Sequence, residues 1–167
     1  TPKGGYTNTA PAGTVEPGKR EVKKDLTQIC AAHNIPYAAQ ASPHRARDLM
    51  KKVQKAVNTD GPCFINVFAP CPRGWRYDPK DSIQLAKLAA DTCVWPMYEV
   101  EDGKLTISYK PREKKPVEQW LKAEGRFKHL FKPGNEELRE EIQADIDRRW
   151  ERLLRQERCD HEEDEEE

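Results

Sequence analysis

A nearly uninterrupted apolar run, from Cys63 to Ala69, constrains the fold of this chain more than any other feature. A run of this length suits a strand that is covered on both faces, as in a parallel sheet. The run stops at Pro70, and a loop rich in proline and glycine follows. In open α/β sheets, ligands bind just beyond the carboxyl ends of such strands. Cys71 therefore stands where a thiolate can hold a metal or cluster, act as a nucleophile, or simply fill space.

The residues before this strand alternate between helical and extended patterns. We expect a helix over 21–34, a strand over 35–41, a second helix that starts at Ser42-Pro43, and then the strand described above. Such alternation predicts βα crossover units and a parallel sheet. Two strands are too few for a stable sheet, so we expect further strands upstream of Thr1 or in another chain.

Both of these helices carry apolar residues at helical spacing, which predicts one buried face on each. The first stripe comprises Val22, Leu26, Ile29, Cys30 and His33, and the second comprises Ala46, Leu49, Met50, Val53, Ala56 and Val57. Cys30, Cys63 and Cys93 fall on apolar faces in this pattern, and we expect them to be inert core residues.

The second half of the sequence predicts a hairpin between helices. Residues 81–93 and 116–124 have helical patterns. Asp102-Gly103, between two alternating runs, is a strong signal for a β-hairpin. Asn135 then caps a long charged helix with a narrow apolar stripe. We expect that helix to pack along a surface or a partner subunit.

Composition excludes several classes of protein. The chain has 167 residues and a formal net charge of zero, so neither a basic nucleic-acid footprint nor a nucleic-acid partner is expected. It has no apolar run long enough for a membrane span and no signal-peptide pattern. Its five cysteines are widely spaced, which favours a reducing, cytoplasmic location. The acidic end, 161–167, is expected to be solvated.

Four ordered segments resemble one known family. They are Ala69–Trp75, Val94–Val100, Lys115–Glu118 and Gly125–Leu130. Together they are similar to the beta subunits of pyruvate:ferredoxin oxidoreductases, within the wider 2-oxoacid:ferredoxin oxidoreductases. The resemblance runs from Thr1 to about Phe131. It implies an α/β fold that is part of a thiamine-diphosphate-binding fold with a mainly parallel sheet, plus a C-terminal hairpin and long helix.

The sequence departs from this family in one large way. The family binds thiamine diphosphate and Mg²⁺ through a Gly-Asp-Gly segment and a later Asn, and it holds most of an iron–sulfur cluster through early cysteines. This sequence contains neither feature. We therefore expect it to correspond to the C-terminal half of the subunit. The expected divisions are an irregular loop near the cofactor (1–20), half of the cofactor-binding α/β domain (21–94), a hairpin and short helix (95–131), and a charged helix with an acidic tail (132–167).

The resemblance also assigns candidate site residues. Cys71 matches the cysteine that gives the fourth thiolate of a 4Fe–4S cluster, and its flanking prolines are expected to fix the direction of the sulfur. The 1–13 loop follows the thiamine motif in the family, so Thr7, Asn8 and Thr9 are candidate cofactor-binding residues. The alternative for this loop is a surface segment ordered by subunit contact. No catalytic residue is assigned.

The function implied by the resemblance is the oxidative decarboxylation of pyruvate to acetyl-CoA. Electrons would pass through 4Fe–4S clusters to ferredoxin, coenzyme A would accept the acyl group, and other subunits or domains would complete the enzyme. Because the cofactor-anchoring motif is missing, this chain alone is predicted to be inactive. Two alternatives stay open. One is the same chemistry on another 2-oxoacid, branched-chain or oxalate, and the other is a non-catalytic assembly module.

Overall fold

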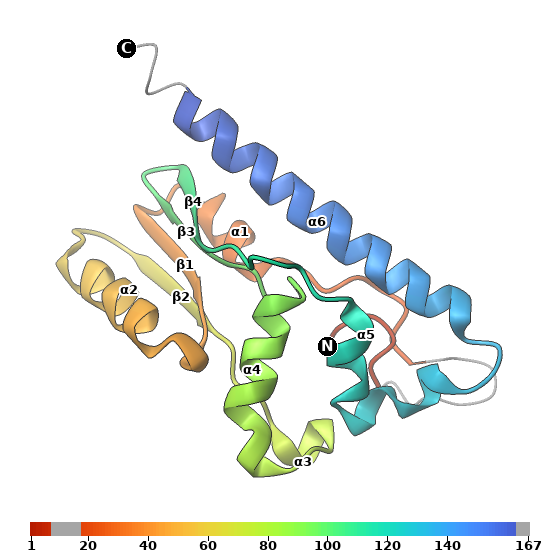
Figure 1. Ribbon diagram of the computed structural model, residues 1–167. Helices are drawn as coiled ribbons and strands as arrows, with labels where there is room; N and C mark the ends of the chain where they lie inside the picture. The colour runs from red at the N-terminus through yellow and green to blue at the C-terminus, as the bar shows by residue number, and fades with distance from the viewer. Residues whose placement is uncertain (8–17, 163–167) are drawn as a thin grey trace.

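The centre of the fold is a four-stranded sheet in the order β2-β1-β3-β4. The structure is a computed structural model that describes residues 1–7 and 18–162 (Figure 1). The strands are β1 (Tyr37–Ala41), β2 (Cys63–Val67), β3 (Met97–Glu101) and β4 (Lys104–Tyr109). β1 and β2 run parallel and are joined through α2 (Ala46–Asn58). This unit confirms the α/β class and the predicted alternation of helix and strand.

The predicted hairpin joins the same sheet instead of forming a separate extension. β3 runs antiparallel to β1, with Ala38 opposite Val100, and β4 runs antiparallel to β3. The sheet of the described residues is therefore mixed, with one parallel pairing, where we expected a mainly parallel sheet. The turn has a local cause: Asp102 and Gly103 have φ values of 48° and 86°. A two-residue type I′ turn needs positive φ at both positions.

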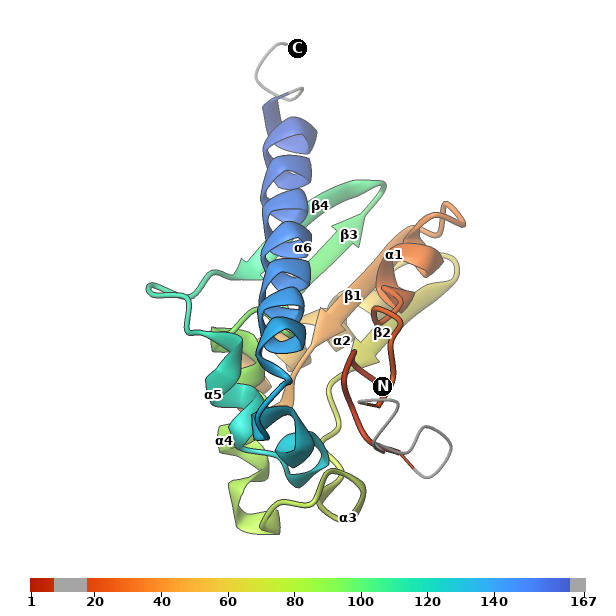
Figure 2. The ribbon, with the colours of Figure 1, turned by 90° about the vertical axis from the view of Figure 1, so that its right-hand side faces the viewer.

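Helices cover both faces of the sheet (Figures 1 and 2). On one face lie α1 (Leu26–Ala31) and α6 (Glu136–Glu162), and on the other lies α2. The Thr27 hydroxyl of α1 donates to the Gln40 side chain at 3.1 Å. Opposite, the Lys55 ammonium of α2 binds the Glu99 carboxylate of β3 at 2.8 Å. Every residue of β1 is buried, so this strand is the core of the layered structure.

The predicted apolar faces of the first two helices are not buried in the described part of the chain. Their residues with the largest exposed fractions, between 45% and 78%, are Val22, Leu26, Ile29, Met50, Val53 and Val57. β2 is the edge strand, and among the described residues no strand lies beyond it. The helices on either side therefore extend past the sheet that would cover them. In α2 the buried side chain is instead Lys52, whose ammonium donates to the Gln40 carbonyl at 2.9 Å.

α1 is also shorter than the predicted helix over 21–34. The Asp25 carboxylate accepts a hydrogen bond from the Gln28 backbone N–H, so the helix begins at Leu26. Asn34 has a positive φ of 55°, and this left-handed residue follows the end of the helix.

A second core lies beyond the carboxyl ends of β1 and β2. It joins α4 (Ser82–Asp91), α5 (Val117–Lys122) and the 3₁₀ helix η3 (Gly125–Phe131). Trp120 and Phe127 are fully buried, with ring centroids 5.2 Å apart. Val94 and Trp95, just before β3, belong to the same core. The four sequence segments of the resemblance thus converge on one region.

α6 runs along one side of the molecule for 27 residues (Figure 2). It buries Ile142, Trp150 and Leu153, in agreement with the predicted narrow stripe. Its carboxylates also bind the outer edge of β4, because the backbone N–H groups of Leu105 and Ile107 donate to Asp160 and Glu157, both at 2.8 Å. α6 therefore closes an edge that would otherwise expose unpaired N–H groups. None of the helices described is both long and apolar enough to cross a membrane.

Candidate functional site

The loop that carries Cys71 connects β2 to α3 (Pro72–Trp75). Cys71 has an exposed side chain and an extended backbone, with φ −105° and ψ 101°. Pro70 and Pro72 flank it, and their rings fix two backbone φ angles. Its carbonyl accepts a hydrogen bond from the Trp75 N–H at 2.9 Å. The structure therefore presents an accessible thiol on a stiffened loop beyond the carboxyl end of β2, where the sequence predicted it.

The far end of this loop is bound to η3. Arg76 is in the left-handed conformation, with φ 61°, and its N–H donates to the Pro72 carbonyl at 2.8 Å. The Arg76 carbonyl in turn accepts from the Gly125 N–H at 3.0 Å. A Cβ at Gly125 would stand 2.7 Å from the Arg76 Cβ, so only glycine allows this approach. The glycine of the Gly125–Leu130 segment thus brings that segment against the Cys71 loop.

Arg126 fills the space between the two segments. Its guanidinium lies 3.9 Å from the ring centroid of Trp75 and 5.6 Å from that of Trp120. It also donates a hydrogen bond to the Glu124 carboxylate. Arg126 and Glu124 are only 4% and 1% exposed. A buried ion pair therefore lies directly behind the aromatic residue that ends α3.

Burial dominates the electrostatics of this pair. It raises the pKa of Glu124 to about 7, and the nearby positive charge of Arg126 only partly offsets this. Burial also lowers the pKa of Arg126, while Glu124 and, to a smaller extent, a negatively charged Cys71 favour the charged guanidinium. One Glu124 oxygen is buried without a hydrogen-bond partner in the described part of the chain. Arg126 thus provides positive charge close to the Cys71 thiol.

An aromatic cluster joins the Cys71 loop to the second segment of the resemblance, Val94–Val100. The ring centroid of Phe68 lies 5.5 Å from that of Trp75 and 5.0 Å from that of Trp95. The Trp95 indole N–H donates to the Ala41 carbonyl, at the end of β1, at 2.9 Å. This cluster fixes the loop relative to the carboxyl ends of both parallel strands.

The first residues of the chain lie against the same site. The Tyr6 N–H donates to the Arg126 carbonyl at 3.1 Å, and the Arg76 guanidinium lies 4.4 Å from the Tyr6 ring centroid. Thr7 follows directly and is half-buried. Asn8 and Thr9 lie outside the described residues. The structure thus places Tyr6 next to the segments that support the Cys71 loop, and the predicted cofactor contacts of the N-terminal loop stay predictions.

The Cys71 thiol is not part of a complete metal site among the described residues. Among residues 1–7 and 18–162, no group of three or more His, Cys, Asp or Glu side chains has a geometry that could hold a metal ion. Cys93 is buried, and burial raises the pKa of its thiol to about 12, as expected of an inert core cysteine. Cys30 and Cys63 are half-buried, and Cys159 is exposed.

Comparison with known proteins shows which subunits the chain is similar to. No family model matches the chain. The chain is 49% identical over 155 residues, 92% of its length, to the pyruvate synthase subunit PorB of Thermotoga maritima. It is 46% identical over 148 residues to the pyruvate synthase subunit PorB of Methanosarcina barkeri. Over these residues, the chain is similar to PorB subunits.

The PorB relatives are longer than this chain. The matches cover 48% of the Thermotoga maritima subunit and 50% of the Methanosarcina barkeri subunit, so the chain spans about half the length of the curated relatives that it matches. A subunit whose name contains another substrate is nearly as similar to this chain. The ketoisovalerate oxidoreductase subunit VorB of Pyrococcus horikoshii is 41% identical over 155 residues and is covered to 49%.

Sequence reasoning found the PorB-like segments and Cys71, but it missed the ion pair behind them. Arg126 stood within a recognised segment and Glu124 just before it, with no role assigned to either. Their one sequence signal is that a Glu and an Arg adjoin a glycine within a segment of the resemblance. Charge alone does not predict burial, because such residues are mostly exposed unless they are paired.

Proposed function

We propose that this chain is part of the beta subunit of a pyruvate:ferredoxin oxidoreductase, and that Cys71 is one thiolate ligand of its 4Fe–4S cluster. The observation that carries this proposal is the exposed Cys71 thiol on a loop fixed by two prolines beyond the carboxyl end of β2. The identity to PorB subunits supports the enzyme class. The chain corresponds to the C-terminal half of such a subunit in this proposal.

One thiol can supply one of the several ligands that an iron–sulfur cluster needs. Iron–sulfur clusters are held by cysteine thiolates, and the described residues supply one suitable sulfur. The remaining ligands would come from polypeptide that corresponds to the rest of the relatives' length. When bound, the cluster accepts electrons one at a time. This chain would contribute a fixed direction for the Cys71 sulfur, set by the flanking prolines.

The N-terminal segment is proposed to face thiamine diphosphate and its Mg²⁺. Tyr6 is bound to Arg126 and stacked by Arg76, so the residues that follow start from a fixed point next to the Cys71 loop. Thr7, with Asn8 and Thr9 after it, offers polar side chains for the cofactor. The motif that anchors the diphosphate and magnesium would lie in the missing half of the subunit.

The proposed reaction joins pyruvate and coenzyme A to give acetyl-CoA and carbon dioxide. In this reaction the bond between the carboxylate and the 2-oxo carbon breaks, the coenzyme A sulfur bonds to that carbon, and the thiol proton is released. Bound clusters would supply the one-electron chemistry by which two molecules of oxidised ferredoxin take up the two electrons. Other subunits, ferredoxin and coenzyme A are therefore the proposed partners, in a reducing cytoplasm. The VorB match makes a branched 2-oxoacid the second candidate substrate.

Reconstitution tests the enzyme class. The chain is combined with the polypeptide that completes its subunit and with the other subunits, and ferredoxin reduction is followed with pyruvate or 2-ketoisovalerate. We expect reduction that requires both pyruvate and coenzyme A, and none from the isolated chain. Faster turnover of 2-ketoisovalerate would favour the second candidate. Pyruvate turnover by the isolated chain, or an inactive complete assembly, would contradict the proposal and favour an assembly module.

A further inference from the structure

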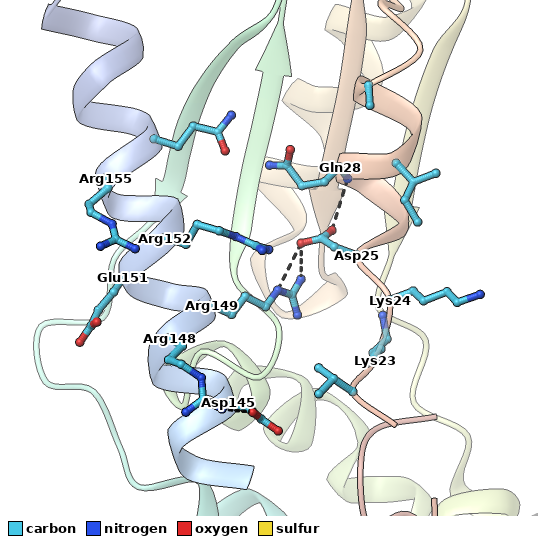
Figure 3. A pocket seen from close by; sticks show the side chains of 14 residues that line it. Lys23, Lys24, Asp25, Gln28, Asp145, Arg148, Arg149, Glu151, Arg152 and Arg155 are labelled. Carbon is cyan, nitrogen blue, oxygen red and sulfur yellow. Dashed lines mark hydrogen bonds and ion pairs between the residues drawn. The ribbon is translucent and has the colours of Figure 1, made fainter. Parts of the chain in front are cut away.

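A groove of about 1070 Å³ separates the start of α1 from the middle of α6 (Figure 3). It lies away from the Cys71 loop, and none of its lining residues belongs to that site. Asp25 and Arg149 close its floor, because the Asp25 carboxylate accepts from both Nε and Nη2 of Arg149, at 3.2 and 2.9 Å. The Tyr98 hydroxyl, from β3, donates to the same carboxylate at 2.8 Å. The floor is therefore rigid.

One wall of the groove is cationic. Arg148, Arg152 and Arg155 follow one another at spacings of four and three residues, which places them on one face of α6. Arg148 binds Asp145. Arg152 and Arg155 are exposed and make no hydrogen bond or ion pair with another described residue. Like charges at these spacings destabilise an isolated helix, and Arg152 and Arg155 have no ion pair among the described residues to offset that effect.

The other wall combines exposed apolar side chains with the charged side chains of Lys23 and Lys24. Val22 and Ile29 line it with exposed fractions of 54% and 45%, and Leu26, on the same stripe, is 47% exposed. Leu26 and Ile29 lie one turn apart on α1, and Val22 lies in the non-helical residues before it. These three exposed side chains are called the Val22–Ile29 strip. Solvated apolar side chains in a row, beside a hollow, are typical of a surface that binds a partner.

Gln28 provides an independent sign that a partner is missing. Its side-chain nitrogen is buried and has no hydrogen-bond acceptor among the described residues. Figure 3 shows the Gln28 side chain extending from α1 toward α6, into the groove. A buried amide donor without an acceptor costs free energy, and a carboxylate or carbonyl oxygen in the groove would remove that cost.

We propose that this groove binds an acidic amphipathic helix of a partner polypeptide. Such a helix places its apolar residues on the Val22–Ile29 strip and its carboxylates on Arg152 and Arg155, with one oxygen in reach of Gln28. The carboxylates of Asp145 and Glu151 on the α6 side repel a phosphate backbone, and the exposed Val22 and Ile29 side chains favour the apolar face of a polypeptide. Charge and polarity together therefore select a polypeptide. This inference does not depend on the proposed cluster.

Fluorescence anisotropy with the full chain tests the proposal. The probe is a labelled synthetic helical peptide with leucines at positions i, i+4 and i+7 and glutamates flanking them, compared with the same peptide carrying lysines for glutamates. We expect the acidic peptide to bind and the basic one not to bind. Arg152→Glu with Arg155→Glu is expected to weaken binding by at least about tenfold. Val22→Ser is expected to weaken it as well.

Arg158→Glu is the matched control, because Arg158 is an exposed arginine of α6 that does not line the groove. It should leave binding within about twofold, and circular dichroism should show that each variant is folded. Failure of the acidic peptide to bind would overturn the proposal. So would equal binding of both peptides, or an equal loss in the Arg158→Glu variant. A dimer of the chain that the Arg152→Glu, Arg155→Glu variant dissociates would assign the groove to a second copy instead.

Discussion

The Arg126 guanidinium lies 3.9 Å from the ring centroid of Trp75, and this contact joins two segments that are fifty residues apart in the sequence. Trp75 ends the short helix that follows Cys71, and Arg126 opens the segment that supports it. The Arg126 side chain donates a hydrogen bond to the Glu124 carboxylate, and the Arg126 carbonyl accepts one from the Tyr6 N–H. The position of the Cys71 loop therefore depends on a buried charge pair and not on apolar packing alone.

Removing the positive charge should destabilise the chain. Arg126→Met leaves the Glu124 carboxylate buried without its partner, which we expect to cost about 3 kcal/mol in the free energy of unfolding near pH 8. Adding Glu124→Gln to that variant should restore part of the loss, because no unpaired charge then stays buried. Urea unfolding followed by tryptophan fluorescence measures both. A loss below about 1 kcal/mol in the single variant would show that the pair is effectively solvated.

The same pair predicts a pH dependence. The pKa of Glu124 is raised from 4.5 to about 7 by burial, so between these values the native state holds a proton that the unfolded state has lost. This contribution to stability is full below pH 4.5 and is lost as the pH rises through about 7. Glu124→Gln should remove it. The free energies of unfolding of the wild type and of this variant are measured from about pH 5 to about pH 8. We expect the wild type to lose stability relative to the variant as the pH rises, and a gain in its relative stability would contradict the assignment.

Asp91 predicts the opposite dependence of stability on pH, because its pKa is lowered and not raised. Burial disfavours its carboxylate, but hydrogen bonds from Lys87, Tyr109 and Lys115 outweigh that effect and hold its pKa at about 2. Its contribution to stability is present above the usual value of 3.8 and is lost as the pH falls through about 2. Asp91→Asn should cost about 2 kcal/mol at neutral pH and flatten the acid limb of the stability curve. Thermal melts from neutral to acid pH measure this, and an unchanged acid limb would rule it out.

The carboxylates that close the β4 edge should protect the chain from self-association. In the Glu157→Ala, Asp160→Ala variant, the Leu105 and Ile107 N–H groups lose their acceptors. We expect a loss of about 2 kcal/mol and faster aggregation, because an edge strand with free N–H groups pairs with other chains. Light scattering during storage measures the second effect. Arg158→Ala is the control, and equal aggregation in both variants would argue against edge protection.

The sequence predicted best what is decided locally. Asp102-Gly103 is a turn whose chemistry is contained in two residues, and the structure has the hairpin there. Cys71 was found because an apolar strand, a proline and a cysteine are adjacent in the chain. What depends on distant partners was not predictable. Met50 and Val57 look like core residues, yet they are exposed because no described strand lies beyond β2.

The sequence also did not predict which charged residues are buried. Lys52 is buried because its ammonium finds the Gln40 carbonyl, the Asp48 carboxylate and the Ser108 hydroxyl, all within 2.9 Å. These partners come from β1, α2 and β4, so only the folded arrangement brings them together. The same holds for Glu124 and Arg126. In each case a charged residue breaks the apolar pattern, and the pattern alone gives no sign of the compensating contacts.

The most direct test of the account is the iron content and electron paramagnetic resonance spectrum of the assembled oxidoreductase with Cys71→Ser. Cys159→Ser serves as the control, because Cys159 is also exposed but lies near the end of α6. We predict that Cys71→Ser loses one cluster or shifts its signal and potential, while Cys159→Ser matches the wild type. An unchanged iron count and an unchanged spectrum in Cys71→Ser would contradict the assignment of this thiol to a cluster.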